Sequence, residues 1–348
     1  MTDRFAFERI KASGLPVLFY GMGNGAEQIK KYLDIFDIPI KGVFASADFV
    51  RGQSFMGFKV IDYERAEKRF GRFLVVPAFG TDRAEVMENI EALSKMQVLV
   101  YPDVPLYGGR LMDRDYVREH KEDTDGIKKL IADKRSLSVL EGWLDFKISG
   151  DIGFLKGIME SPEEVMKKAA AGTRRFADLG AYDGDTVLSY ASSVPCYDEI
   201  YAVEPDPYSF KRLLRNTSGL KGVKALNCAV SDTGGTLAFS SESSRNSHVS
   251  EEGICVRAEK GDDLLYPLSP DLIKLDLEGH EMRALKGMKR LIKDKKPDLL
   301  IAVYHRTDDF FEIPFFIKDL VPEYRLSFCK YSCYPSWDMF AHFTVKTS

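Results

Sequence analysis

Short apolar runs alternate with amphipathic stretches in the first third of the chain. The apolar runs have the length of strands, and the stretches between them place apolar residues at helical spacing. The pattern predicts strands at 15–20, 41–45, 73–77 and 98–101, with helices that include 26–33 and 83–95. Strands that alternate with helices predict a small parallel sheet.

The strand signal disappears between residues 107 and 170. The stretches 125–134 and 136–146 have apolar positions at helical spacing and charged faces between them. Ser161 followed by Pro162 is typical of a helix start, because Pro is favoured at the first helical position. This region therefore predicts a helical bridge between two α/β units.

A second series of strands begins near Arg174. The pattern predicts parallel strands at 176–180, 200–204, 223–230, 272–277 and 299–305, with two short extra strands at 236–240 and 254–258. Two aromatic-rich runs at 324–331 and 339–345 flank Pro335 and predict a closing antiparallel hairpin. We therefore expect an α/β fold in which this part forms a seven-stranded sheet. The predicted boundaries are 1–110 for the first unit, 111–170 for the bridge and 171–348 for the second unit.

Two acids mark the ends of the first two strands in the second series. Asp178 precedes a turn of the form G-x-x-x-G from Gly180 to Gly184, and Glu204 ends the next strand. Ligands of such sheets lie across the carboxyl ends of the strands, and one carboxylate can accept hydrogen bonds from two ribose hydroxyls. Asp178 would repel a pyrophosphate but attract an ammonium or a sulfonium. The pattern thus predicts S-adenosylmethionine as the cofactor, with glycines where a side chain would occupy the cofactor's space.

The first unit has a Gly-rich turn of its own. Gly21-Met-Gly23-Asn-Gly25-Ala26 fits the dinucleotide-binding form G-x-G-x-x-A between a strand and a helix. The expected ribose-binding acid does not end the next strand, because Asp48 comes only after Ser46. A nucleotide site and a docking or scaffolding role are both open for this Rossmann-like unit.

Composition excludes several classes of protein. The formal charge of −4 gives no basis for a nucleic-acid partner. The five cysteines are odd in number and lie mostly in apolar runs, which favours reduced thiols over a disulfide framework. No apolar run reaches the roughly 20 residues of a membrane helix, and residues 1–5 lack the apolar core of a signal peptide. We expect a cytoplasmic protein without membrane insertion, and a homodimer is one option for its assembly.

Residues from about 174 to 345 resemble the FkbM family of methyltransferases. The resemblance is carried by the stretch 178–186, by Val203-Glu-Pro-Asp206, by Ala229-Val-Ser-Asp232 and, most specifically, by Ile273-Lys-Leu-Asp-Leu-Glu-Gly-His-Glu281. It implies an S-adenosylmethionine-dependent enzyme that methylates hydroxyl groups of sugars or secondary metabolites. One departure is Phe328-Cys-Lys-Tyr331, which stands where the family has a polar pair on the sixth strand.

Motif and resemblance together predict the site residues. Those expected to hold the cofactor are Asp178, Gly180, Ala181, Tyr182, Asp183, Gly184, Thr186, Glu204, Pro205, Asp206, Ala229, Val230 and Ser231. Those expected to be catalytic are Asp276, Glu278 and His305. On an extended strand Lys274, Asp276 and Glu278 would share one face, with Asp276 by the transferred methyl. Glu278 or His305, a histidine of near-neutral pKa, would deprotonate the acceptor.

The sequence thus predicts an O-methyltransferase that modifies a hydroxyl of a sugar, a glycan or a glycosylated metabolite. We expect no bound metal, because no further hard ligand joins Asp276 and Glu278. Two alternatives use the first unit: a nicotinamide-dependent oxidoreductase and a non-catalytic module that binds a nucleotide sugar. The acceptor itself and the methylated atom stay open.

Overall fold

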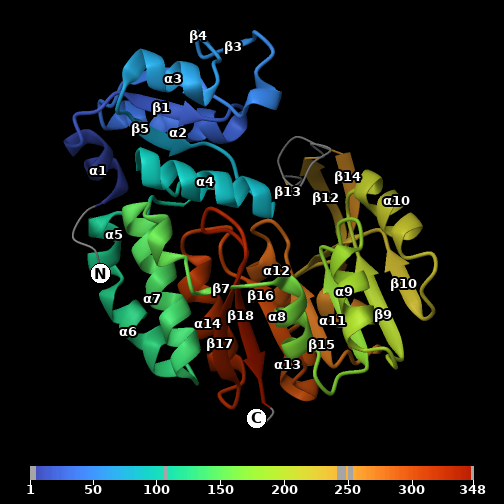
Figure 1. Ribbon diagram of the computed structural model, residues 1–348. Coiled ribbons are helices and arrows are strands. Elements are labelled where there is room, and N and C mark those ends of the chain that lie inside the picture. Colours follow the sequence, from blue (N-terminus) through green and yellow to red (C-terminus); the bar gives the residue numbers. More distant parts are fainter. Residues whose placement is uncertain (1–4, 106–108, 241–247, 250–253, 346–348) are drawn as a thin grey trace.

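A computed structural model describes residues 5–105, 109–240, 248–249 and 254–345. The N-terminal unit has a four-stranded parallel sheet in the order β2-β1-β5-β6 (Figure 1). Its elements are α1 (Ala6–Ala12), β1 (Val17–Tyr20), α2 (Asn24–Ile35), β2 (Ile40–Phe44), η1 (Ala47–Phe49), β3 (Ser54–Phe55), β4 (Phe58–Lys59), α3 (Tyr63–Phe70), β5 (Leu74–Pro77), α4 (Ala84–Met96) and β6 (Val98–Leu99). The predicted Rossmann-like sheet is confirmed.

The bridge is helical, as predicted, apart from one short strand. It comprises α5 (Arg114–Glu119), α6 (Lys121–Leu130), α7 (Lys134–Ser149), η2 (Ile152–Phe154), β7 (Met159–Glu160) and α8 (Pro162–Ala169). Helix α8 begins as its sequence predicts, because the Ser161 side chain accepts a hydrogen bond from the N–H of Glu164 and Pro162 occupies the first turn.

The C-terminal sheet has the order β10-β9-β8-β15-β16-β18-β17-β7. Its elements are β8 (Arg175–Leu179), α9 (Asp185–Ser193), β9 (Glu199–Val203), α10 (Pro207–Asn216), β10 (Val223–Leu226), α11 (Gly261–Leu265), β15 (Leu272–Leu275), α12 (Glu281–Gly287), α13 (Lys289–Lys295), β16 (Asp298–Ala302), α14 (Asp309–Leu320), β17 (Arg325–Tyr331) and β18 (Met339–Thr344). Strands β17 and β18 form the predicted antiparallel hairpin. An eighth strand is present because β7 of the bridge pairs in parallel with the outer edge of β17.

A second, smaller sheet stands beside the main one. It consists of β11 (Ala229–Ser231), β14 (Ile254–Lys260), β12 (Gly235–Ser240) and β13 (His248–Val249) in that order. The single strand expected at 223–230 is therefore divided: β10 stays in the main sheet, whereas β11 turns away to pair with β14. That turn carries residues 229–231 to the carboxyl edge of the main sheet.

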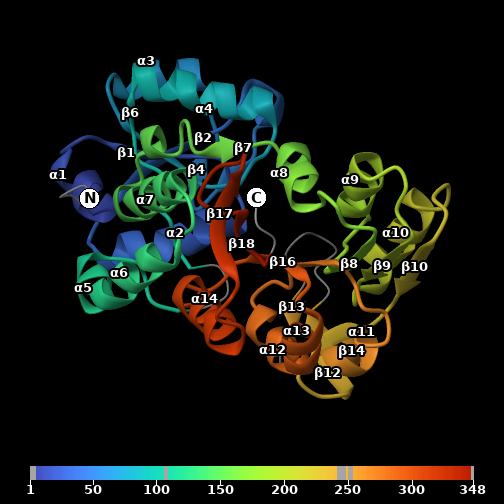
Figure 2. The same cartoon turned by 90° about the horizontal axis from the view of Figure 1, so that it is seen from below.

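The N-terminal unit is fixed to the rest of the chain by its packing (Figures 1 and 2). One buried hydrophobic cluster runs from Leu18 in β1 through Trp143 in α7 to Ile273 in β15. Thr81 and Tyr334 exchange two backbone hydrogen bonds of 2.8 and 2.9 Å, which ties the loop after β5 to the connection between β17 and β18. The three parts therefore share a core.

Candidate active site

An open cavity of about 500 Å³ lies at the carboxyl edge of the parallel strands, where β8, β9 and β15 end. Six of the residues expected to bind the cofactor line it: Gly180, Glu204, Pro205, Ala229, Val230 and Ser231. Asp276 and Glu278, expected to be catalytic, line the same cavity. The two groups of predicted residues therefore meet in one place.

Glu204 follows β9, and backbone groups fix its carboxylate. Its Oε2 accepts a hydrogen bond of 2.8 Å from the N–H of Tyr182, and its Oε1 accepts one of 2.8 Å from the N–H of Asp206. Burial raises the pKa of Glu204 to about 8, although the two backbone N–H groups act in the opposite direction. A carboxylate has about four acceptor positions, so two remain for a ligand in the cavity.

Asp178 lies in β8 and is fully buried, and it does not line the cavity. Neither of its carboxylate oxygens has a hydrogen-bond partner among the described residues. Burial raises the pKa of Asp178 to about 7, while the ammonium of Lys274 on the neighbouring strand lowers it. A buried carboxyl group without donors is costly, so this position favours a ligand or solvent donor nearby.

The glycines of the turn after β8 are required for a reason other than the expected one. Gly180 has φ +86°, and a Cβ on it would lie 2.0 Å from the carbonyl oxygen of Asp276. Gly184 has φ +91°, and a Cβ there would lie about 3 Å from Leu213 and Thr217. Contacts within the protein, rather than the space of a cofactor, thus exclude side chains at both positions.

The remaining residues of the predicted cofactor set lie outside the lining of the cavity; they are Ala181, Tyr182, Asp183, Gly184, Thr186 and Asp206. Tyr182 contributes the backbone N–H that holds Glu204. Asp206 caps α10, because its Oδ2 accepts hydrogen bonds from the N–H and the hydroxyl of Ser209. Any direct contact of these side chains with a cofactor stays a prediction.

Asp276 lies directly after β15, and two side chains hold its carboxylate. The ammonium of Lys274 lies 3.1 Å from its Oδ2, and the hydroxyl of Tyr304 donates to its Oδ1 over 3.3 Å. Burial raises the pKa of Asp276, but Lys274 and His305 outweigh it and hold that pKa below its ordinary value. The ionised carboxylate is thereby fixed at the rim of the cavity.

The expected common face of Lys274, Asp276 and Glu278 is absent, because β15 ends at Leu275. Glu278 lies in the following turn with φ +53°. Glu278 nevertheless approaches the same imidazole as Asp276, because the turn brings its Oε2 within 3.1 Å of His305 Nε2. Asp276 and Glu278 therefore approach one imidazole by way of the turn and not of the strand.

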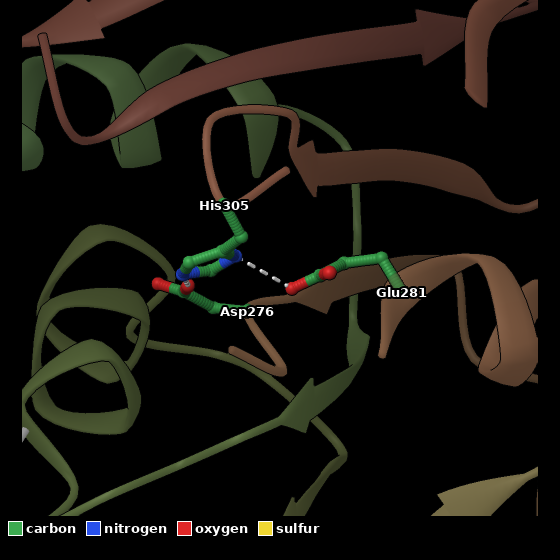
Figure 3. Close-up of side chains that lie close together, drawn as sticks. All are labelled: Asp276, Glu281 and His305. Carbon is green, nitrogen blue, oxygen red and sulfur yellow. Dashed lines mark hydrogen bonds and ion pairs between the residues drawn. The ribbon is translucent and has the colours of Figure 1, made fainter. Parts of the chain in front are cut away.

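His305 follows β16 and lies among three carboxylates, two of which Figure 3 shows. Its Nδ1 lies 2.9 Å from Glu281 Oε1, and its Nε2 lies 3.1 Å from Glu278 and 3.5 Å from Asp276. Burial lowers the pKa of His305, but Glu281 and Glu278 outweigh it and raise that pKa well above its ordinary value. This direction contradicts the expected near-neutral pKa and favours the protonated ring, which is a poor acceptor for a substrate proton.

Residues 178–331 match the sequence profile of the methyltransferase FkbM domain. These residues form an FkbM methyltransferase domain. The hexuronic acid methyltransferase AglP of Haloferax volcanii is 30% identical over 165 residues, which are 45% of this chain and 64% of that protein. The chain thus spans a little under two thirds of the length of this curated relative.

The fold of both α/β units recurs in a solved FkbM protein. A crystal structure of methyltransferase FkbM from Methylobacillus flagellatus KT superposes with a TM-score of 0.73 at 15% identity. The superposition covers 97% of this chain and 92% of that one. An N-terminal Rossmann-like unit in front of an FkbM domain is therefore a shared architecture.

Among the described residues of the FkbM domain, one group of side chains has the composition of a metal site. Ligand atoms of Asp276, Glu281 and His305 all lie within 4.8 Å of one another. A metal would need a lone pair from an imidazole nitrogen, whereas here each nitrogen faces a carboxylate at 2.9–3.5 Å. The same distances suit a protonated ring held by carboxylates, and metal independence stays a prediction.

Glu281 is the principal residue that the sequence did not single out for chemistry. It is fully buried at the start of α12, where its Oε1 accepts hydrogen bonds from His305 and from the N–H of Leu277 over 2.6 Å. An acid in the first turn of a helix is the signal that the sequence carries, but that signal indicates a capping role equally well. Only the fold brings it to His305.

Two of the three glycines in the Gly-rich turn of the N-terminal unit, Gly21 and Gly25, lie close against neighbouring residues. A Cβ on Gly21 would lie 2.4 Å from the ring of Phe79, and one on Gly25 would lie 2.4 Å from the carbonyl oxygen of Ala78. Close packing of the loop after β5 thus accounts for these glycines without a nucleotide.

No helix in the described parts of the chain is both long and apolar enough to cross a membrane.

Proposed function

We propose that this protein transfers a methyl group from S-adenosylmethionine to a hydroxyl group of a sugar, a glycan or a glycosylated metabolite. The observation that carries the proposal is the carboxylate of Glu204, fixed by two backbone N–H groups at the wall of a cavity that Asp276 and Glu278 also line. A nucleoside-binding acid and two carboxylates suited to proton chemistry thus share one space.

The residues around the cavity fit this cofactor. The two free acceptor positions of Glu204 match the two hydroxyls of a ribose, and Ala229–Ser231 provide a wall for the adenine. Asp178 is buried, and its carboxylate oxygens have no hydrogen-bond partner among the residues that the structure describes; it therefore favours a cationic group at this edge over a phosphate. Bound S-adenosylmethionine would supply a methyl group already activated by its sulfonium.

Glu278 is the side chain best placed to take the proton of the acceptor hydroxyl. Both oxygens of Asp276 are engaged, by Lys274 on one side and by Tyr304 on the other. Glu278 faces His305 through Oε2 alone, and its side chain is 27% exposed. We assign the proton to Glu278, and we assign to Asp276 the task of orienting the acceptor beside the methyl group.

Sugar hydroxyls are supported as acceptors by the likeness to a hexuronic acid methyltransferase within the same domain. The N-terminal turn, packed against Phe79, gives no comparable support to a nicotinamide-dependent oxidoreductase.

Calorimetric titration with S-adenosylhomocysteine, S-adenosylmethionine and NAD⁺ tests the cofactor. We expect the first two to bind, NAD⁺ not to bind, and Glu204→Ala to weaken binding of both by at least about tenfold, because two hydrogen bonds to a charged group are lost. Binding of NAD⁺ alone would refute the proposal.

Turnover is tested with Glu278→Gln, which keeps the shape of the side chain but cannot accept a proton. Removal of a general base costs about 10²–10⁴-fold in rate. We expect the rate at which S-adenosylhomocysteine is formed to fall by this factor, while the affinity for the cofactor stays unchanged. Glu323→Gln, an exposed residue paired with Lys296, is the matched control. Full activity of Glu278→Gln would remove this residue from the proton transfer.

A further inference from the structure

The charges around the cavity of Glu204 are unevenly distributed. The carboxylates of Glu204, Asp276 and Glu278 line it, and no lysine or arginine is among the described residues of its lining. A ligand that fills the cavity therefore meets negative charge first. Because opposite charges attract more strongly where water is partly excluded, this lining should favour a cationic ligand over an uncharged one of similar shape.

Asp276 presents its charge to the cavity, whereas the nearest ammonium lies behind it. The side chain of Asp276 is 21% exposed, but that of Lys274, whose Nζ lies 3.1 Å from Asp276 Oδ2, is only 5% exposed and does not line the cavity. The hydroxyl of Tyr304 donates to Asp276 Oδ1 over 3.3 Å, and His305 Nε2 lies 3.5 Å from the same atom. The carboxylate is thus held in one orientation before any ligand arrives.

Lys274 is shared between two carboxylates on this side of the cavity. In β15 it pairs in register with Asp178 of β8, while its ammonium bonds Asp276. Burial acts to raise the pKa of Asp178 and of Asp276, and the ammonium of Lys274 acts to lower both. One ammonium for two carboxylates leaves an excess of negative charge, which a further cation in the cavity would reduce.

S-adenosylmethionine and S-adenosylhomocysteine differ by one methyl group and by the positive charge on sulfur. We propose that Asp276 distinguishes the two by this charge, so that the protein binds the methyl donor more tightly than the demethylated product. The inference rests on the proposed methyltransferase function and deepens it. Specificity is a difference between two affinities, and here the product lacks the charge that the donor offers to Asp276. At equal concentrations the donor would therefore displace the product.

Glu278 lines the same cavity but belongs to its other side. Its Oε2 lies 3.1 Å from His305 Nε2. The backbone of Asp276, by contrast, packs on the turn after β8, because a Cβ on Gly180 would lie 2.0 Å from the carbonyl oxygen of Asp276. Asp276 thus adjoins the turn expected to hold the cofactor. Loss of the charge of Glu278 should accordingly affect the discrimination far less than loss of the charge of Asp276.

The test compares the affinities of three ligands for the full chain by calorimetric titration at pH 7. S-adenosylmethionine carries a sulfonium, sinefungin carries a protonated amine in its place, and S-adenosylhomocysteine carries neither. We expect the two cationic ligands to bind at least about tenfold more tightly than S-adenosylhomocysteine, a ratio that corresponds to about 1.4 kcal/mol. Two unit charges a few ångströms apart near a protein surface interact more strongly than this.

Asp276→Asn keeps the shape of the side chain and removes its charge. We expect this variant to lose most of the preference, because its affinity for the two cationic ligands falls while that for S-adenosylhomocysteine changes little. A merely structural role of Asp276 would weaken all three ligands equally. Glu278→Gln removes a charge from the same cavity and should retain the preference, and the exposed Glu323→Gln is the second control.

The outcomes separate the two proposals. If none of the three ligands binds the unaltered protein, the proposed function itself fails. If S-adenosylhomocysteine binds as tightly as the cationic ligands, or Asp276→Asn weakens all three equally, the inference about Asp276 fails and the methyltransferase proposal stands. A preference for sinefungin alone would indicate a hydrogen bond to its amine and would also overturn the inference. The ratio in the unaltered protein decides the matter even if Asp276→Asn does not fold.

Discussion

Binding of S-adenosylhomocysteine should release a proton from Glu204. In the ligand-free protein this carboxyl group is 6% exposed, and burial raises its pKa to about 8. Two ribose hydroxyls would bring its hydrogen-bond donors to four, together with the N–H groups of Tyr182 and Asp206. A carboxyl group that accepts four hydrogen bonds must be ionised, so ligand binding should lower its pKa far below 7.

The size of the effect follows from the pKa. With a pKa of about 8, the carboxyl group of Glu204 holds about 0.9 proton at pH 7 and about 0.1 at pH 9. Binding should therefore release about 0.9 proton at pH 7 and almost none at pH 9. Because only the ionised fraction binds, affinity should rise about tenfold between these two pH values.

The stability of the ligand-free protein should change with pH in the direction opposite to the affinity. The ordinary pKa of a glutamate is 4.5, so between this value and about 8 the folded protein holds a proton that the unfolded chain has lost. The contribution of Glu204 to the stability of the ligand-free protein accordingly falls as pH rises through that range. Ligand should counteract the loss.

Titration calorimetry in buffers of different ionisation enthalpy counts the released protons directly. Glu204→Gln should remove the share of Glu204, about 0.9 proton at pH 7. Asp178, whose pKa burial raises to about 7, would add about 0.5 proton at pH 7 if the bound ammonium stabilises its ionised form. Asp178→Asn separates this share from that of Glu204. Release below about 0.2 proton at pH 7 in the unaltered protein, or an affinity independent of pH from 6 to 9, would refute the reasoning.

Three further substitutions test the site and its scaffold. Glu281→Gln keeps both acceptor contacts but removes a negative charge, so the pKa of His305 should fall, as NMR titration of the ring would show; an unchanged pKa would mean that Glu278 alone sets it. Lys274→Met leaves the buried carboxyl groups beside it without their cation and should cost about 3–5 kcal/mol in free energy of unfolding, measured by denaturant titration. Gly180→Ala forces a Cβ to 2.0 Å from a carbonyl oxygen at φ +86° and should lower the melting temperature strongly, whereas Gly219→Ala should not; equal melting temperatures would contradict the packing of this turn.

Much of the fold could be predicted because its signals are local. Each buried parallel strand is a short apolar run, and each helix repeats apolar positions at helical spacing, so both parallel sheets and the closing hairpin were predicted from the chain. The strand at 223–230 was predicted as one, because nothing in its sequence marks the point where β11 leaves the main sheet for β14. The pairing of β7 with β17 is likewise a long-range contact without a local pattern.

The sequence also determined which cofactor class to expect. Asp178, the glycines after it and Glu204 lie at the ends of consecutive strands, and parallel strands bring such ends to one edge. The order of elements along the chain was therefore enough to place Gly180 and Glu204 at one cavity, whereas Ala229–Ser231 reach it because β11 turns away from the main sheet.

Tertiary structure alone decided the electrostatics of the site and what surrounds it. The pKa of His305 depends on Glu281 and Glu278, and the turn after β15 had to be folded before those carboxylates met the ring. The ring of Trp337 packs against Gly80 of the N-terminal unit, more than 250 positions away in the chain. Pairwise distances between remote residues set desolvation and charge coupling, and periodicity along a chain does not encode them.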